Sequence, residues 1–417
     1  MSAPLDLKNY FCAQRWFGGK GKKIADIRCL ASLAVVKNCD WQIYEVIYED
    51  GATEWYQVPL IQNEDALASP EVREQVFELL KMSQTIPAVF MLRVENFRPP
   101  PSVSESRLLT IEQSNSSISY GSTSFLKIFR KLEDGLNPDI EILSHLTKLQ
   151  SDIRVPKIYS TLQMEHRGKT YALAVLLEMV ANRGNAWEIA LEAARHGQDF
   201  LKEAELLGKR TAEMHLALAT ESSNPAFGMI SSSPVDWNEI SNNLRRDTAE
   251  LLQLLTAKIP ALKGESSTLA AQFVAEAPSN LEKLIHPPAA FPLSRIHGDY
   301  HLGQILTTEE DFIIIDFEGE PARPLSERRK HFSPLIDVAG MLRSFHYAGC
   351  TAGAFTWQKN AADTFLNAYF SICRGSRILP DEITTRQLLE VFSWQKKLYE
   401  IRYELNNRPD WLWIPLK

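Results

Sequence analysis

The sequence predicts an α+β fold with two lobes and an additional N-terminal domain. Three observations support this prediction. Alternating apolar and polar residues near the start indicate antiparallel strands, short strands and a helix follow, and the rest of the chain has helical periodicity. A chain of 417 residues is long enough for two or three domains. We therefore expect domains at residues 1–98, 99–180 and 181–417.

The composition excludes several classes of protein. Hydrophobic residues make up 45% and charged residues 23% of the chain, as in an ordinary globular protein. A formal net charge of −7 argues against nucleic acid as a partner, because phosphate binding favours a basic face. The five scattered cysteines indicate reduced thiols. The sequence shows no signal peptide and no apolar run of ~18 residues, so we expect a cytoplasmic protein without a membrane partner.

The N-terminal domain is predicted from strand and helix signals. Residues 27–36, 41–49 and 54–60 alternate as strands of an antiparallel sheet. Ser69 and Pro70 suit the start of a helix that runs to about residue 82. We therefore expect an antiparallel sheet followed by a helix in this domain.

A glycine-rich basic segment, residues 15–23, precedes this sheet. It could be a phosphate-binding loop. Because neither a strand precedes it nor a helix follows it, we favour a mobile basic turn that Trp16 and Phe17 anchor.

The next segment has the features of a nucleotide-binding lobe. Residues 108–112 and 124–129 are predicted strands, joined by a loop at residues 113–122. Small residues such as Ser116 and Ser117 would let backbone N–H groups approach phosphates, although an ordinary hairpin loop has a similar composition.

Lys127 interrupts the second of these strands. A lysine between apolar residues is usually an edge-strand charge. In kinases, a lysine on such a strand contacts the α- and β-phosphates and pairs with a glutamate on the following helix. Glu141 is the matching candidate, since Asn137-Pro138 begins an amphipathic helix there. A buried strand at residues 171–177 then leads into a hinge, where Glu178 and Val180 are candidates for adenine contacts.

The polar stretch that begins at His297 carries the strongest chemical signal. Asp299 and Gln304 follow His297 at the spacing of the kinase catalytic loop H-x-D-x-x-x-x-N, with Gln in place of Asn. The apolar run Phe312–Ile315 then ends in Asp316. Two carboxylates arranged in this way suit phosphoryl transfer: one orients the attacking hydroxyl, and the other holds Mg²⁺. We interpret His297 as support for the loop.

The remainder of the chain is predicted to be mostly helical. We interpret His215, within one of these segments, as a packed core histidine. The expected helices cover residues 200–219, 237–257, 267–284, 336–346, 355–373 and 383–406.

Several strings resemble one known family. His297-Gly298-Asp299-Tyr300-His301-Leu302-Gly303-Gln304 resembles the loop H-G-D-x-H-x-G-Q of bacterial maltokinases, which are relatives of the aminoglycoside phosphotransferases. Residues 15–20, 125–141, 316–321, 333–341 and 403–411 are also similar to that family. The resemblance implies a bilobal protein-kinase-like fold with an N-terminal antiparallel-sheet cap domain and a mostly helical C-terminal lobe.

The resemblance also implies an activity. Maltokinases use ATP and Mg²⁺ to phosphorylate maltose at its anomeric hydroxyl, and the maltose 1-phosphate feeds α-glucan synthesis. It implies Asp299 as the catalytic base, Lys127 as the phosphate-binding lysine paired with Glu141, and Gln304 and Asp316 as Mg²⁺ ligands. Amide and carboxylate oxygens both suit Mg²⁺.

A sugar site requires polar groups for hydroxyls and aromatic faces for the rings. The C-terminal tail supplies this mixture, and its tyrosines and glutamates form i,i+4 pairs on a predicted helix. The alternative is that Trp411 only holds the C-terminus against the lobe. The candidate sugar residues are His301, Glu318, Tyr399, Glu400, Tyr403, Glu404, Arg408 and Trp411.

Two rival interpretations remain open. One is a kinase for another sugar such as glucosamine, and the other is a non-catalytic nucleotide- or sugar-binding module. Joint retention of Lys127, Asp299, Gln304 and Asp316 argues against the second. The family resemblance also suggests a trehalose-to-maltose isomerase as a candidate partner.

Overall fold

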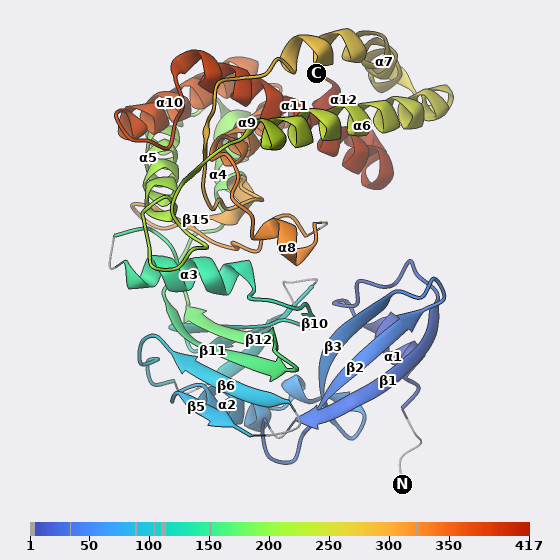
Figure 1. Cartoon of the computed structure of the whole chain (residues 1–417), viewed down its shortest axis with the longest axis vertical. Helices are drawn as coiled ribbons and strands as arrows, with labels where there is room; N and C mark the ends of the chain where they lie inside the picture. Colours follow the sequence, from blue (N-terminus) through green and yellow to red (C-terminus); the bar gives the residue numbers. More distant parts are fainter. Residues whose placement is uncertain are drawn as a thin grey trace. The chain divides into compact units, whose positions relative to one another are not determined.

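The computed structural model describes residues 5–33, 35–87, 90–103, 105–109, 114–149, 152–321 and 323–417. The chain forms two compact units. The first comprises residues 1–150, 155–181 and 323–326, and the second comprises residues 151–154, 182–322 and 327–417. Antiparallel sheets in the N-terminal region and many helices further along the chain confirm the predicted α+β class (Figure 1).

The cap sheet forms the start of the first unit, and its antiparallel strands are as predicted. Its order is β1-β2-β3-β10, and β4 also pairs with β3. Trp16 and Phe17 are buried in an aromatic cluster with Phe11 and Tyr56, which confirms that they anchor the basic segment. The elements of this part are α1 (Leu7–Ala13), β1 (Ile24–Leu33), β2 (Asp40–Tyr48), β3 (Thr53–Ile61), β4 (Glu64–Asp65), η1 (Ala66–Ala68), α2 (Pro70–Leu79) and β10 (Lys131–Leu132).

A second antiparallel sheet completes the first unit, with the order β5-β6-β11-β12-β9-β8-β7. Helix α3 begins after Asn137, whose side chain accepts a hydrogen bond from the backbone N–H of Asp139, as expected for an N-cap. The elements are β5 (Gln84–Ile86), β6 (Met91–Asn96), β7 (Ser106–Leu109), β8 (Ser116–Tyr120), β9 (Ser124–Ile128), α3 (Pro138–Lys148), β11 (Ile158–His166) and β12 (Lys169–Glu178).

The prediction that residues 113–122 form a loop is wrong. It contains strand β8, because Ile118 and Tyr120 alternate with serines and are buried in the core of the sheet. Ser116 and Ser117 therefore begin a strand. Residues 110–113, which include the end of a predicted strand, lie outside the described residues.

The two sheets of the first unit share one hydrophobic core. Trp41 and Ile43 from the cap strand β2 belong to the same buried cluster as Leu126 of β9 and Leu173 of β12. Because the core is continuous, the cap and the second sheet are packed as one body.

The second unit is mostly helical, as predicted, and α6 and α7 form a helical hairpin (Figure 1). Within the described part of the chain, we find no helix whose length and hydropathy would suit a membrane span. The helices are α4 (Ala186–His196), α5 (Leu201–Leu218), α6 (Pro234–Lys258), η2 (Ile259–Ala261), α7 (Gly264–Leu284), η3 (Leu302–Gln304), α8 (Leu325–Arg328), α9 (Leu335–Ala352), α10 (Phe355–Cys373), α11 (Glu382–Asn407), η4 (Pro409–Trp411) and α12 (Trp413–Leu416). Short strand pairs are β13 (Ile230–Ser231) with β14 (Pro292–Leu293), and β15 (Ile305–Thr307) with β16 (Phe312–Ile314).

Candidate functional site

Lys127 lies on β9 in the first unit and is 5% exposed. Its Nζ is 3.5 Å from Oδ2 of Asp139, in the first turn of α3. Glu141, the predicted partner, is buried two residues further along the same helix. A buried ammonium requires a nearby carboxylate. Sequence reasoning missed Asp139, although its place in the first turn after Pro138 was a usable signal.

Ser116 and Ser117 lie beside the lysine strand. Ser117 is directly opposite Lys127 in the antiparallel pairing of β8 with β9, so the two side chains share one face of the sheet. Ser116 is opposite Ile128, and its hydroxyl accepts a hydrogen bond of 2.7 Å from Nε of Arg130.

The predicted hinge follows β12. The backbone N–H of Glu178 donates to the carbonyl of Lys157 at 2.8 Å, and that of Met179 donates to the carbonyl of Thr123 at 2.9 Å. The Glu178 carboxylate accepts from the backbone N–H of Lys157. These bonds fix the chain just before Val180, which is half-buried.

The predicted catalytic loop lies in the second unit, where Asp299 is half-buried. His297 is buried, and its Nε2 donates to the carbonyl of Ile315 at 2.9 Å while its Nδ1 accepts from the backbone N–H of Asp299 at 3.4 Å. The imidazole thus joins the loop to the residue before Asp316, which is a supporting role.

A buried carboxylate holds the backbone of this loop. Asp337 on α9 accepts hydrogen bonds from the N–H groups of His297 at 2.7 Å and Gly298 at 2.9 Å. Its Oδ2 is also 3.1 Å from Nε2 of His215, whose Nδ1 contacts the hydroxyl of Tyr369 at 2.9 Å. Burial alone would raise the pKa of Asp337, but the hydrogen bond and charge of His215 and the bond from Gly298 hold that pKa below its ordinary value.

Sequence reasoning gave Asp337 no role and His215 only a packing role. The available signal was a carboxylate within the apolar sequence Leu335-Ile336-Asp337-Val338-Ala339. A carboxylate among apolar residues is seldom left unpaired in a folded protein.

The structure brings the two predicted Mg²⁺ ligands together. Nε2 of Gln304 donates to Oδ2 of Asp316 at 3.2 Å. Gln304 ends η3, and Asp316 follows β16 with a left-handed backbone (φ 65°), a conformation that aspartate adopts more readily than most residues. The sharp turn places Glu318 soon after it, where the Glu318 carbonyl accepts a hydrogen bond from Arg328.

His301 caps η3. Its Nδ1 accepts a hydrogen bond from the backbone N–H of Gly303 at 3.0 Å, which leaves Nε2 as the protonated nitrogen of the neutral ring. Burial lowers the pKa of His301, and this outweighs the opposite effect of the Asp299 charge. His301 is therefore a neutral hydrogen-bond donor at physiological pH.

The predicted sugar residues of the tail divide between two faces of α11. Glu400 accepts two hydrogen bonds from Arg343 on α9, and Glu404 accepts from Tyr347 and from Arg408. These carboxylates therefore face α9 and are already neutralised by arginines. We name the other face, which carries Tyr399 and Tyr403, the aromatic track and include Arg408 and Trp411 in it.

The aromatic track is exposed and continuous. The rings of Tyr399 and Tyr403 stack with centroids 6.3 Å apart. The Arg408 guanidinium lies 5.2 Å from the ring centroid of Tyr403 and 4.9 Å from that of Trp411. Burial and the negative charges of Glu320 and Asp299 raise the pKa of Tyr399 to about 12, so this end of the track is close to the catalytic loop.

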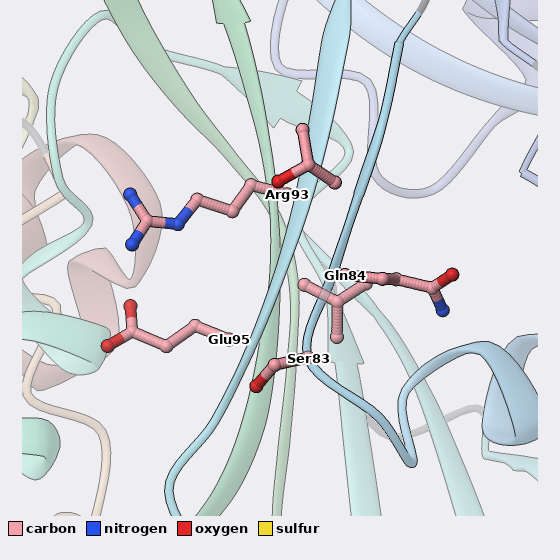
Figure 2. A pocket seen from close by; sticks show the side chains of 6 residues that line it. Ser83, Gln84, Arg93 and Glu95 are labelled. Carbon is pink, nitrogen blue, oxygen red and sulfur yellow. The ribbon is translucent and has the colours of Figure 1, made fainter.

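The first unit also contains a pocket. It has a volume of about 270 Å³ and lies beside β5 and β6, where Arg93 and Glu95 point to the same side of the sheet (Figure 2). None of the predicted site residues belongs to its lining, which comprises Ser83, Gln84, Thr85, Arg93, Val94 and Glu95.

Two family models match the chain. Residues 109–370 match the model of the phosphotransferase enzyme family, and residues 10–76 match the maltokinase N-terminal cap domain. A glucosamine kinase from Streptacidiphilus jiangxiensis is 25% identical over 359 residues, covering 82% of this chain and 78% of the relative. A glucosamine kinase from Mycolicibacterium smegmatis is 26% identical over 74% of this chain and 77% of the relative.

A solved structure shows the same fold along the whole chain. A glucosamine kinase in complex with glucosamine, ADP and inorganic phosphate aligns with a TM-score of 0.72 and 20% identity, covering 100% of this chain and 98% of its own. The comparisons give no support to an association with a trehalose-to-maltose isomerase. The family model covers more than half of the chain and includes Lys127, Asp299, Gln304 and Asp316. The chain therefore belongs to the phosphotransferase enzyme family, and it carries the maltokinase N-terminal cap domain.

Proposed function

We propose that this chain is a cytoplasmic sugar kinase that uses ATP and Mg²⁺ to phosphorylate maltose at its anomeric hydroxyl. The product is maltose 1-phosphate, a precursor for α-glucan (glycogen) synthesis. The single observation that carries the choice of a disaccharide is the aromatic track, which offers successive stacking surfaces that begin near Asp299.

In this proposal, each unit supplies part of the chemistry. Lys127 binds the α- and β-phosphates, and Glu141 and Asp139 hold its ammonium in place. Ser117 lies on the Lys127 side of the same sheet, whereas the side chain of Ser116 points to the other face and bonds Arg130. Glu178 and Val180 meet the adenine edge. In the second unit, Asp299 orients the anomeric hydroxyl and accepts its proton as the oxygen attacks the γ-phosphoryl group.

Gln304 and Asp316 are the proposed Mg²⁺ ligands. Their side chains are in hydrogen-bond contact and together provide amide and carboxylate oxygens, the donor types that Mg²⁺ prefers. The bound ion supplies neutralisation of charge on the transferring phosphoryl group. Asp337 and His297 keep the loop and the end of β16 in register, so that Asp299 and Asp316 keep their positions.

The tail is the proposed sugar site. One glucose ring contacts Tyr399, with His301 and Glu318 close to the reacting hydroxyl, and the second ring extends along Tyr403 towards Arg408 and Trp411. Aromatic faces suit the C–H faces of sugar rings, and nearby polar groups orient the hydroxyls. Glu400 and Glu404 shape this face through their arginine partners, and in this proposal they do not contact the sugar directly.

Glucosamine is the second candidate substrate, favoured by the names of two relatives. Its ammonium group would require a carboxylate that is not already neutralised. Both tail glutamates are paired with arginines, which supports the neutral disaccharide.

The test is ATP consumption by the purified protein with Mg²⁺ and maltose, glucosamine, glucose or trehalose, with the phosphate located by NMR. We expect turnover with maltose and an anomeric phosphate. Turnover with glucosamine alone would support the sugar kinase activity and refute maltose as the substrate. Nucleotide binding without turnover on any of these sugars would favour a binding module.

Tyr403→Ala tests the aromatic track. Loss of a stacking surface for the second ring should raise the KM for maltose by about tenfold and leave glucose turnover unchanged. Ile383→Ala, an exposed substitution on the same helix, is the control. An equal effect on both sugars would show that the track does not contact the second ring.

A further inference from the structure

A single side chain of the cap sheet is bonded to two strands of the neighbouring sheet. Gln57 on β3 is fully buried, and its Nε2 donates to the carbonyl of Phe129 and to that of Leu173, both at 2.7 Å. Its Oε1 accepts from Nε1 of the buried Trp41 at 2.8 Å. Both amide hydrogens and the amide oxygen are therefore used, which fixes the orientation of the side chain.

These contacts lie just past the end of the strand that carries Lys127. Phe129 is the first residue after β9, two residues beyond Lys127, and Leu173 belongs to β12, which pairs with β9. The backbone N–H of Gln57 also donates to the carbonyl of Arg130 at 2.9 Å. One residue of the cap thus holds three carbonyl groups at the end of the lysine strand.

A second connection reaches the opposite side of Lys127. Arg130 is 1% exposed, its Nη2 pairs with the carboxylate of Asp65 in the cap, and its Nε donates to the hydroxyl of Ser116. The guanidinium also lies 5.0 Å from the ring centroid of Trp16. Ser116 precedes Ser117, the residue opposite Lys127. The cap therefore contacts both β8 and β9, the two strands that carry these side chains.

We propose that Gln57 is a positioning residue for nucleotide binding, through which the cap sheet sets the place of Lys127 and Ser117. This inference rests on the proposed role of Lys127 in holding phosphates. In Gln57→Leu the Phe129 carbonyl loses the side-chain donor, while the Leu173 carbonyl keeps the backbone N–H of Phe129 at 3.0 Å and the Arg130 carbonyl keeps the backbone N–H of residue 57. A buried carbonyl that loses its donor costs free energy, so the chain at Phe129 shifts to find another partner. A shift of the strand moves Lys127, and a misplaced binding group loses affinity.

The test is Gln57→Leu in the full chain, measured by titration with Mg·ATP in the absence of sugar. We expect the Kd for Mg·ATP to rise about tenfold, the value for loss of one or two buried hydrogen bonds, with the KM for sugar unchanged. Trp41→Phe removes only the indole donor and should give a smaller rise in the same Kd. This milder variant keeps the proposal testable where Gln57→Leu does not fold.

The control is Val46→Ala in the aromatic cluster with Phe11 and Tyr56, which lies on the face of the cap sheet away from Gln57. It should lower the melting temperature without a change in Kd. An unchanged Kd in folded Gln57→Leu and Trp41→Phe, or an equal rise in Val46→Ala, would overturn the inference.

Lys127→Ala separates this inference from the proposed function. If Lys127→Ala leaves the Kd for Mg·ATP unchanged, the proposed nucleotide site is wrong. If Lys127→Ala weakens binding and Gln57→Leu does not, the site stands and only the positioning role fails.

Discussion

The lysine strand in the first unit and the catalytic loop in the second are both held by buried polar side chains, but with different chemistry. A neutral amide, Gln57, donates to carbonyl groups behind Lys127. A carboxylate, Asp337, accepts from N–H groups behind Asp299, with His215 beside it. Gln57 faces backbone carbonyls and therefore acts as a donor, whereas Asp337 faces backbone N–H groups and therefore acts as an acceptor.

This difference has a physical consequence. A neutral amide does not titrate, so its contribution to stability is independent of pH. A buried carboxylate makes stronger hydrogen bonds in its charged form, but its burial has a cost that only good partners offset. The contribution of Gln57 should therefore be insensitive to acid, and that of Asp337 sensitive.

The largest expected effect is a loss of turnover when Asp299, which the second region positions, is replaced. Asp299→Asn retains the shape of the side chain and removes the base, so kcat should fall by about 10²–10⁴-fold. Nucleotide binding and the melting temperature should change little, because Asp337 still holds the loop. Single-turnover kinetics and Mg·ATP titration measure the two quantities, and an active variant would refute the assignment of the base.

Asp337→Asn tests the charged support itself. Since an amide has only one acceptor oxygen, at least one buried N–H of the loop loses its partner, and His215 loses a counter-charge. We expect the free energy of unfolding to fall by about 3 kcal/mol. Urea denaturation measures it, with Asp363→Asn, which removes an exposed partner of Lys359, as the control expected to cost under about 1 kcal/mol.

The pH dependence of that difference is a separate test. The pKa of Asp337 is below its ordinary value in the folded chain, so its stabilisation is fully present above about pH 4, the unfolded value. It is lost as the pH falls through the folded pKa. The gap in stability between wild type and Asp337→Asn should thus narrow in acid, whereas the gap for Gln57→Leu should stay constant. If both stability differences became smaller in acid, the distinction between a neutral and a charged supporting side chain would be wrong.

Much of the second region could be predicted from the sequence because its signals are local. The spacing from His297 to Gln304 and the strand that ends at Asp316 lie within one short stretch, and the structure puts Gln304 and Asp316 in contact. Helices α10 and α11 follow from apolar periodicity, which a single segment contains.

The supports behind these groups could not be predicted, since they join residues far apart in the chain. Gln57 is 72 residues from Phe129 and 116 from Leu173, and Asp337 is 40 from His297. The sequence around a glutamine in a strand does not indicate which distant backbone groups its side chain will contact. Strand β8 was missed for a different reason: the serine-rich composition of residues 113–122 is typical of loops, and burial of Ile118 and Tyr120 against the shared core overrides it.

The smallest expected effect on stability concerns His346 on α9. Its side chain is uncharged in the folded chain at neutral pH, but unlike the Gln57 amide it can take up a proton in acid. Its Nε2 contacts the carbonyl of Ile414 at 3.0 Å, and Nε2 of Gln358 lies 3.1 Å from its Nδ1. Burial lowers its pKa to about 4, with a further contribution from the positive charge of Arg343. Burial and the positive charges of Arg343 and Lys397 outweigh the hydrogen bonds to Ile414 and Gln358, so the folded chain resists protonation of His346.

The sign of the pH effect follows from this depressed pKa. The unfolded chain takes up the proton near pH 6.5 and the folded chain only near pH 4, so the free energy of unfolding should fall between these values. We expect a loss of about 2 kcal/mol across this window, measured by urea denaturation at several pH values. His346→Gln should remove this loss, whereas the exposed His196→Gln should not. A wild-type profile that stays flat from pH 6.5 to pH 4 would mean that His346 is charged at little cost, and that only carboxylates such as Asp337 make the second unit sensitive to acid.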